Sequence, residues 1–451
     1  MRPPMNKLSL RIKLLFSTGD LATSIPLAIL MFFQLYFMTD VAGLRPDLAG
    51  WAVGIGKIWD AVNDPLIGLL SDRIRSRFGR RRAMLLFCAV PLGLSFLLMW
   101  LVPPFGPIGL AFYYALTFIV FDTFFTLIHV SYNSLTPELT SDYDERSTLN
   151  GYRMAFSIVG TLGTIILATV MGWFISDKRI LFATLGIGLG LVSIIPPLVV
   201  FKVTKPYDPQ QEDAPMSVKQ AITETLSNRP FWMVMGLYLL SWTTASIMSA
   251  VLIYFANYYM RIPEQANYFI LLAEGSAILF IPFWVWVARK LDKRRAYMLG
   301  TVTWVVVLLI LSAIRSDQVV LAYLLAALSG SGIATAYVLP WSMIPDIIEI
   351  DQAKTGERRE GSYYSFASFA QKLATGAAVW GMGQALAFAK YITPAAGQPL
   401  PAQPTAALNA IRIFMGPVPA VLLLLSLIFA WRYNVTRESH QALVEELQNR
   451  G

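Results

Sequence analysis

Two aspartates in one apolar stretch have the type and spacing that could do chemistry. Asp60 and Asp64 lie four residues apart in KIWDAVNDP, so a helix would place them on one face about one turn apart. Two buried carboxylates at this distance repel each other unless a cation or a proton neutralises them. The pair could therefore bind a hard cation such as Na⁺ through its oxygens, or hold a proton on one carboxyl. Lys57, three residues before Asp60, offers the alternative of a structural ion pair.

A second polar face is expected in the segment 107–135. Asp122, Thr126 and His129 follow one another at spacings of four and three residues, which is one face of a helix. The only other histidine of the sequence, His440, lies in the C-terminal tail. An imidazole at position 129 could accept a proton or donate a hydrogen bond to a solute. A neutral histidine bonded to a neighbouring helix is the simpler alternative.

Further polar side chains interrupt other apolar segments. Arg153 lies in NGYRMAFS and Lys372 in FAQKLATG. An ionisable side chain at bilayer depth costs at least about 2.5–3.5 kcal/mol by insertion scales, so each one requires a partner or a function. Together with the acids, these cations indicate a charge network inside a helical bundle. The polar residues that we expect to line the same cavity also include Asp20, Asn133 and Gln371.

Long apolar runs must position these residues. The chain has 451 residues, of which 56% are hydrophobic and only 14% charged, and its mean hydropathy is +0.55. Soluble domains contain about 25% charged residues. Apolar runs separated by short polar loops therefore predict an all-α membrane protein. We expect twelve transmembrane helices, at 14–39, 46–70, 83–102, 107–135, 149–173, 180–201, 230–259, 264–288, 296–314, 318–342, 363–390 and 405–432.

The basic loops predict the topology and an internal repeat. The densest of them, DRIRSRFGRRR and RKLDKRR, follow the second and the eighth expected helices, whereas loops on the other side carry almost no charge. The positive-inside rule then makes both termini cytoplasmic. The equivalent position of the two loops predicts two pseudo-symmetric six-helix halves, as in the major facilitator fold. We expect these halves at 1–201 and 230–432, a cytoplasmic linker at 202–229 and a cytoplasmic tail at 433–451.

Several other classes of protein are disfavoured. A net charge of +8 could indicate nucleic-acid binding, but the basic residues lie in short loops where the positive-inside rule places them. The single cysteine, Cys88, allows no disulfide framework. With no nucleophile–base pair, metal-ligand cluster or phosphate loop, we predict neither enzyme activity nor a cofactor. We expect a monomer in the cell membrane, the inner membrane in a bacterium, that interacts with the lipid bilayer, a small organic solute and a coupling cation.

The run KIWDAVNDPLIGLLSDRIRSRFGRRR resembles the signature of the glycoside–pentoside–hexuronide:cation symporters, the melibiose-permease-like branch of the major facilitator superfamily. TGDLATS, YFMTDVAGL, NSLTPELTSDYDERSTLNGYRMAFS and PDIIEIDQAKTGERREGSYYS extend the resemblance along nearly the whole chain. The resemblance implies a cation site formed by Asp60 and Asp64 with Thr126, which is a metal site if the ion is Na⁺. It also matches the family's arginine on the fifth helix to Arg153 and its lysine on the eleventh helix to Lys372.

The sequence departs from the melibiose-type sugar site at three positions. Ser24 aligns with an aspartate of that site, His129 with a second aspartate, and Asn133 with a tryptophan. Galactoside specificity therefore does not carry over, and the loss of an acid shifts the balance of coupling ions from Na⁺ toward H⁺. The segment LPWSMIPD additionally resembles animal relatives that carry lysophospholipids.

These observations predict a symporter coupled to H⁺ or Na⁺ that carries a small organic solute, such as a sugar, glycoside or uronide, by alternating access. Arg153 and His129 would meet the solute, and Lys372 would balance charge between loaded states. Asp72 and Arg73, with the acids of 346–361, would form gates. The alternative is the same fold carrying an amphiphile such as a lysophospholipid.

Overall fold

The computed structural model describes residues 8–73, 76–140, 143–204, 228–355, 360–395 and 398–435. Every regular element in these ranges is helical, and ten helical segments are long and apolar enough to cross a membrane. Within the same ranges, α3 and α13 do not meet that criterion, because they carry charged and amide side chains, among them Asp60, Asp64 and Lys372. Most of the predicted linker and tail, 205–227 and 436–451, lies outside the described residues.

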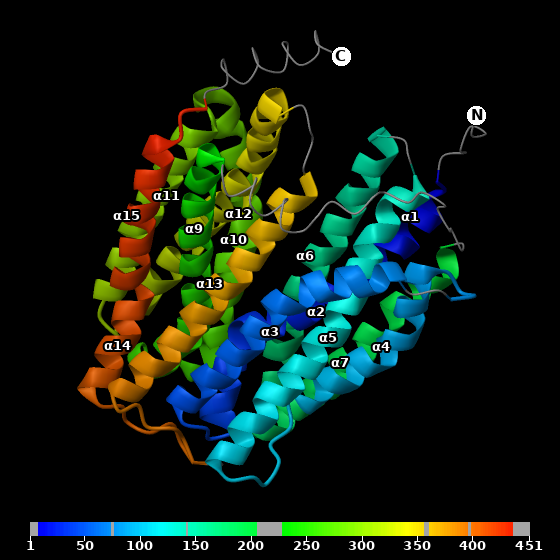
Figure 1. Ribbon diagram of the computed structural model, residues 1–451. Helices are drawn as coiled ribbons and strands as arrows, with labels where there is room; N and C mark the ends of the chain where they lie inside the picture. Colours follow the sequence, from blue (N-terminus) through cyan, green and yellow to red (C-terminus); the bar gives the residue numbers. More distant parts are fainter. Residues whose placement is uncertain are drawn as a thin grey trace, which may run out of the picture. The chain divides into compact units, whose positions relative to one another are not determined.

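The first unit contains the helices from α1 to α7, blue to green in Figure 1. Its first membrane helix is built from α1, a short 3₁₀ turn η1, α2 and a π-helical turn η2. α3 packs against α5, α4 packs against α5 and α7, and α2 packs against α6 and α7. The bounds are α1 Leu10–Ser17, η1 Thr18–Asp20, α2 Leu21–Tyr36, η2 Phe37–Val41, α3 Pro46–Arg73, α4 Arg80–Leu98, α5 Pro107–Leu139, α6 Tyr143–Phe174 and α7 Lys178–Val203.

The second unit contains the helices from α9 to α15, green to red in Figure 1. α10 packs against α12, α11 packs against α12 and α15, and α9 packs against α13 and α15. The bounds are α9 Arg229–Tyr254, η3 Phe255–Tyr259, η4 Pro263–Gln265, α10 Ala266–Leu291, α11 Lys293–Ala313, α12 Val319–Thr355, α13 Glu360–Phe388, α14 Thr405–Met415 and α15 Pro417–Arg432.

The two units have the same internal packing. In each unit the second membrane helix pairs with the fourth, the third pairs with the fourth and the sixth, and the first pairs with the fifth and the sixth. A helix that crosses a bilayer must form its backbone hydrogen bonds within itself. The side chains then determine which faces of neighbouring helices pack together. The repeated packing confirms the prediction of an all-α membrane protein with two pseudo-symmetric six-helix halves.

Several predicted helix bounds are wrong, for local reasons. α12 continues to Thr355, thirteen residues past its predicted end at 342, because a polar sequence can extend a helix beyond the apolar layer. The last membrane helix is not continuous, since it divides at Gly416 into α14 and α15. A Cβ atom on Gly416 would lie 2.5 Å from the Cβ of Ser312 in α11. The division falls where Pro417 begins α15 and where α11 approaches closely, and a hydropathy profile shows neither.

Candidate functional site

The first polar cluster lies between α3 and α5, and we call it the carboxylate cluster: Asp60, Asn63, Asp64, Asp122 and Thr126. The hydroxyl of Thr126 donates to Oδ1 of Asp64 at 3.2 Å. The amide of Asn63 donates to Oδ2 of Asp122 at 3.2 Å and to its carbonyl oxygen at 3.3 Å. All members except Asp64, which is half-buried, are at most 5% exposed. The cluster brings the predicted cation ligands Asp64 and Thr126 into contact across two helices.

Asp60 has a partner on its own helix. The ammonium of Lys57 lies 2.9 Å from Oδ2 of Asp60, and the same ammonium lies 5.3 Å from the ring centre of Phe118. The structural ion pair that the sequence left as an alternative is therefore formed. Within the described ranges, no three His, Cys, Asp or Glu side chains are arranged to hold a metal ion. A cation bound at this cluster would have to draw its ligands from carboxylate, hydroxyl and amide oxygens together.

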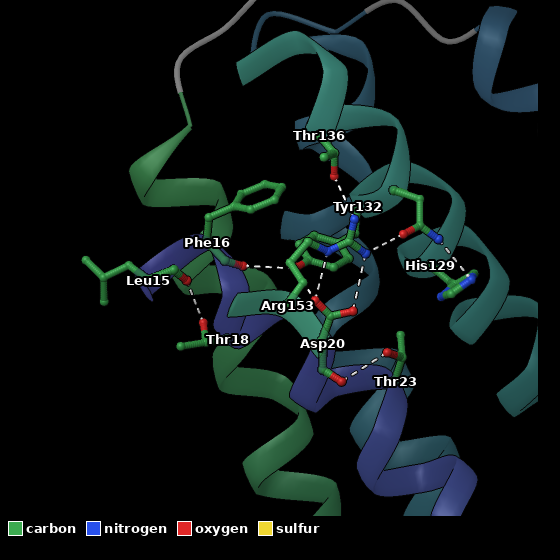
Figure 2. A network of polar contacts seen from close by, with 10 residues as sticks. Leu15, Phe16, Thr18, Asp20, Thr23, His129, Tyr132, Thr136 and Arg153 are labelled. Carbon is green, nitrogen blue, oxygen red and sulfur yellow. Dashed lines mark hydrogen bonds and ion pairs between the residues drawn. The ribbon is translucent and has the colours of Figure 1, made fainter. Parts of the chain in front are cut away.

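The second polar cluster surrounds Arg153 (Figure 2), and we call it the arginine cluster: Asp20, Tyr132, Asn133, Thr136 and Arg153. The guanidinium of Arg153 binds both carboxylate oxygens of Asp20, at 2.9 and 3.2 Å. The hydroxyl of Tyr132 donates to Oδ2 of Asp20 at 2.7 Å, and the Tyr132 ring centre lies 4.4 Å from the guanidinium carbon. Bidentate, charge-assisted pairs of this kind are among the stronger polar contacts in proteins.

His129 joins the arginine cluster through Asn133. Arg153 donates from Nη1 to the hydroxyl of Thr136 at 2.8 Å and from Nη2 to Oδ1 of Asn133 at 2.6 Å. Nδ2 of Asn133 lies 2.9 Å from Nε2 of His129. The His129 ring is stacked on Phe125, with ring centres 5.8 Å apart and planes 8° from parallel. The structure thus connects four predicted site residues in the order Asp20, Arg153, Asn133, His129.

One face of α5 carries residues of both clusters. Asp122, Thr126, His129, Asn133 and Thr136 follow at spacings of four, three, four and three residues, which is one continuous stripe on a helix. The first two belong to the carboxylate cluster and the last two to the arginine cluster. A rotation or shift of α5 would therefore act on both clusters at once.

The 3₁₀ turn η1 places Asp20 opposite Arg153. The backbone carbonyl of Asp20 accepts from the hydroxyl of Thr23 at 3.0 Å. Gly19 is required beside it, because a Cβ atom there would lie 2.4 Å from the ring of Tyr132. The tight approach of Tyr132 to this turn allows its hydroxyl to reach both the carboxylate of Asp20 and the carbonyl of Phe16, the latter at 3.1 Å.

Ser24 occupies the position that aligns with an aspartate of the melibiose-type site. Its side chain is buried against α6, where a Cβ atom on Gly160 would lie 2.1 Å from the Ser24 hydroxyl. Among the described residues this hydroxyl has no hydrogen-bond partner. Asp20, one helical turn earlier, is the acid of the same membrane helix that reaches Arg153. A solute-binding role of Ser24 stays a prediction.

The other two predicted site residues belong to the second unit. Gln371 on α13 accepts a short hydrogen bond from the hydroxyl of Tyr238 on α9. Lys372 follows it on α13 and is half-buried. Beside them, the ring of Tyr238 lies 5.5 Å from that of Trp341, which lies 5.4 Å from Tyr364. The expected role of Lys372 in balancing charge stays a prediction.

The predicted gate residues are described only in part. The side chains of Asp72 and Arg73, at the end of α3, lie outside the described part of the structure. Asp346, one of the acids in 346–361, binds the ammonium of Lys293 through both carboxylate oxygens at 2.7 Å. Beyond the end of α15, burial raises the pKa of the Tyr433 phenol, and the charges of Asp346 and Asp292 raise it further. The phenol therefore stays protonated beside this ion pair.

Sequence reasoning missed three residues of the two clusters: Asn63, Tyr132 and Thr136. Asn63 follows Asp60 by three residues, so the helical spacing that selected Asp64 could have selected it as well. Thr136 continues the spacing of the α5 stripe. No signal in the sequence identified Tyr132, because its hydroxyl reaches Asp20 only through the packing of η1 against α5.

Comparisons with known proteins agree with this architecture. Residues 15–437 match the family model described as MFS/sugar transport protein. An uncharacterized symporter of Synechocystis is 33% identical, over 98% of this chain and 97% of the relative. The sodium-dependent lysophosphatidylcholine symporter 1 of Xenopus tropicalis is 27% identical, over 99% of this chain and 91% of the relative.

Among solved structures, the crystal structure of a D-xylose-proton symporter has the same fold. The TM-score is 0.70 at 16% sequence identity, and the superposition covers 95% of this chain and 98% of the other. At this identity the likeness concerns the fold alone.

Proposed function

The chain belongs to the MFS/sugar transport protein family and is a multi-pass membrane symporter rather than an enzyme, and on that premise we propose that it couples the uptake of a small organic solute to H⁺ or Na⁺. The solute class that we propose is a sugar, glycoside or uronide. The observation that carries the proposal is the contact between Asp64 and Thr126, which joins a carboxylate and a hydroxyl oxygen from two helices at 3.2 Å.

Asp60 and Asp64 would bind the coupling cation, with Thr126 as a further oxygen ligand. Oxygen donors of this kind suit a hard cation, and a carboxylate can equally take up a proton. In this proposal the ammonium of Lys57 neutralises Asp60 when no coupling cation is bound, and the entering cation competes with it. Coupling requires that cation and solute favour the same conformation of the carrier.

The solute would meet the arginine cluster, and α5 would connect the two events. Arg153 and His129 are proposed as solute contacts, and Lys372 as the residue that balances charge between loaded states. We place the protein in the cell membrane with both termini cytoplasmic, with halves at 1–201 and 230–432, as the basic loops indicate. The gate proposal concerns Asp72, Arg73 and the acids of 346–361.

A transport assay of the Asp64→Asn variant tests the cation site. The full chain is reconstituted into liposomes and given a panel of labelled sugars, glycosides and uronides under an ion gradient. The variant is expected to lose gradient-driven accumulation by at least tenfold, because the amide cannot exchange a cation, while exchange of solute without a gradient continues. Accumulation equal to that of the unmodified chain would contradict the proposed cation site.

Two further variants sharpen the assay. Thr126→Val removes one oxygen ligand, and we expect an apparent cation affinity about tenfold weaker, equivalent to about 1.4 kcal/mol. Asp47→Asn is the matched control, because Asp47 lies on the same helix but pairs with the exposed Arg45 at 2.7 Å. Uptake in Na⁺-free buffer with a pH gradient, compared with a Na⁺ gradient at constant pH, identifies the coupling ion.

A second candidate solute is an amphiphile such as a lysophospholipid. It is favoured by the full-length similarity to the Xenopus symporter, and by Trp341 of LPWSMIPD, whose ring packs between Tyr238 and Tyr364. A thermal-shift screen of the purified chain against sugars and lysophospholipids, each with and without Na⁺, separates the two classes. Stabilisation by lysophospholipid alone would favour the amphiphile.

A further inference from the structure

The polarity of the hydrogen bonds around Asn133 determines the protonation state of His129. An arginine guanidinium can only donate hydrogen bonds. The atom of Asn133 that lies 2.6 Å from Nη2 of Arg153 must therefore be the carbonyl oxygen Oδ1. The amide nitrogen Nδ2 then points to Nε2 of His129, 2.9 Å away. Because an amide nitrogen only donates, Nε2 must carry a lone pair.

At Nε2, the arrangement drawn in Figure 2 fits a neutral His129 with its proton on Nδ1. A proton added to Nε2 would place two donors against each other. The amide of Asn133 could turn over to offer Oδ1 to His129, but its Nδ2 would then face the guanidinium, which also only donates. A proton on His129 and the bond from Arg153 to Asn133 consequently exclude each other.

Loss of the hydrogen bond from Arg153 to Asn133 would also affect other residues that Arg153 contacts. Arg153 is the residue that holds the carboxylate of Asp20 at 2.9 Å, and Asp20 ends the 3₁₀ turn in the first membrane helix. A hydrogen bond donated by a charged group is stronger than one between neutral groups, so its loss can shift an equilibrium between two conformations. The stacking of Phe125 holds the plane of the His129 ring, which keeps Nε2 directed at Asn133.

Charged groups surround His129 on several elements. Arg153 on α6 reaches His129 through Asn133, and carboxylates lie at Asp20 in η1 and on α3 and α5. α4 contributes Arg81, whose guanidinium donates to the carbonyl of Ser134 at 2.6 Å. Among the described residues, the charged groups joined by hydrogen bonds to α5 or to the two clusters include Asp20, Lys57, Asp60, Asp64, Arg81, Asp122 and Arg153.

We propose that His129 is a proton-binding site of this transporter, and that a proton bound there releases Arg153 from Asn133. This inference rests on the proposed cation-coupled function and adds a second ion site to it, distinct from Asp64. It follows from the order of donors and acceptors in the chain from Asp20 through Arg153 and Asn133 to His129.

The two histidines of the sequence make a direct test possible. The full chain carrying His440→Gln and labelled with ¹⁵N-histidine gives the imidazole signals of His129 alone. The ¹⁵N chemical shifts are expected to show the tautomer with the proton on Nδ1 and an unprotonated, hydrogen-bond-accepting Nε2 at pH 8. The tautomer with the proton on Nε2 would overturn the proposal without any further variant.

A titration of two variants tests the link to Arg153. Asn133→Asp offers acceptors to both neighbours, so His129 is expected to bind a proton about tenfold more tightly, a rise of about one pH unit in its titration midpoint. Thr136→Val removes another bond of Arg153 but does not touch His129, and the midpoint should stay unchanged. An unchanged midpoint in Asn133→Asp would overturn the proposal. The tautomer measurement and the titration do not depend on transport. A negative result for the cation site in the Asp64→Asn transport assay would therefore be distinguishable from a negative result for His129.

Discussion

α3 packs against α5 in the first unit as α10 packs against α12 in the second. Between α3 and α5 lie the carboxylates of Asp60, Asp64 and Asp122. Between α10 and α12 lie small residues: a Cβ atom on Gly330 would lie 2.6 Å from the backbone of both Ala273 and Ala277. The α3–α5 contact thus contains carboxylates, whereas the α10–α12 contact combines close backbone approach at Gly330 with hydrogen bonds of Ser276 and Trp284 to α12.

The helices that precede α4 and α11 can be compared by counting back from a residue of positive φ in front of each, although α3 ends at Arg73 and α10 at Leu291. Gly79 before α4 has φ 85° and ψ 144°, and Asp292 before α11 has φ 83° and ψ 163°. Aligned on these turns, Asp60 corresponds to Ala273 and Asp64 to Ala277. α10 thus carries alanines where an ungapped count places the two acids of α3. We infer that the acids of the first half are present for binding rather than for packing.

Exchange of residues between the corresponding positions should have the largest effect. Ala277→Asp would place a carboxylate against Gly330 at bilayer depth, and we expect it to destabilise the fold by about 2.5–3.5 kcal/mol. Asp64→Ala should leave the thermal unfolding midpoint unchanged or raise it, although it abolishes coupling. Unfolding of both variants in detergent measures the difference. If the Ala277→Asp variant were as stable as the unmodified chain, the proposed difference between the α3–α5 and α10–α12 contacts would be contradicted.

A larger side chain between α10 and α12 should have a smaller effect on the stability of the fold. Gly330→Ala brings a methyl group against the backbone of α10, and overpacking of this kind costs about 1–3 kcal/mol. Gly163→Ala in α6 is the matched control, because a Cβ atom there would meet no atom within 4 Å. The control should keep its unfolding midpoint or gain up to about 1 kcal/mol from helix propensity. A Gly330→Ala variant as stable as the control would argue against close packing of α10 on α12.

The smallest effect is expected at a second backbone turn that the halves share. The π-helical turns η2 and η3 end with the same two hydrogen bonds, from Ala42 to Phe37 and Leu44 to Met38 in one half and from Met260 to Phe255 and Ile262 to Ala256 in the other. The residue with positive φ is Gly43 in the first turn and Arg261 in the second, at 75° and 58°.

A left-handed conformation costs a residue with a side chain about 1–2 kcal/mol relative to glycine. Arg261→Gly should therefore stabilise the protein by about 1 kcal/mol, and Gly43→Ala should destabilise it by a similar amount. Thermal unfolding of the two variants checks both signs. A loss of stability in Arg261→Gly would mean that contacts of the arginine side chain outweigh its backbone strain.

Much of this arrangement is predictable from helical spacing alone. The stripe on α5 and the shared face of Asp60 and Asp64 follow from residues three and four apart in long apolar runs. The two-half architecture follows from the repeated basic loops. By contrast, the close approach of Ser312 to Gly416 depends on the packing of α11, and a sequence read for hydropathy contains no information on that distance.

The sequence by itself determined that this protein is a bundle of membrane helices with acids, a histidine and an arginine inside it, because the bilayer restricts a spanning chain to a few forms. Only the tertiary structure showed which polar side chains inside the bundle are hydrogen-bonded or ion-paired to one another. Lys57 binds Asp60, Thr126 reaches Asp64, and Asn133 lies between Arg153 and His129. Contacts between helices depend on the rotation and the height of one helix against another, which the packing of all the side chains sets together.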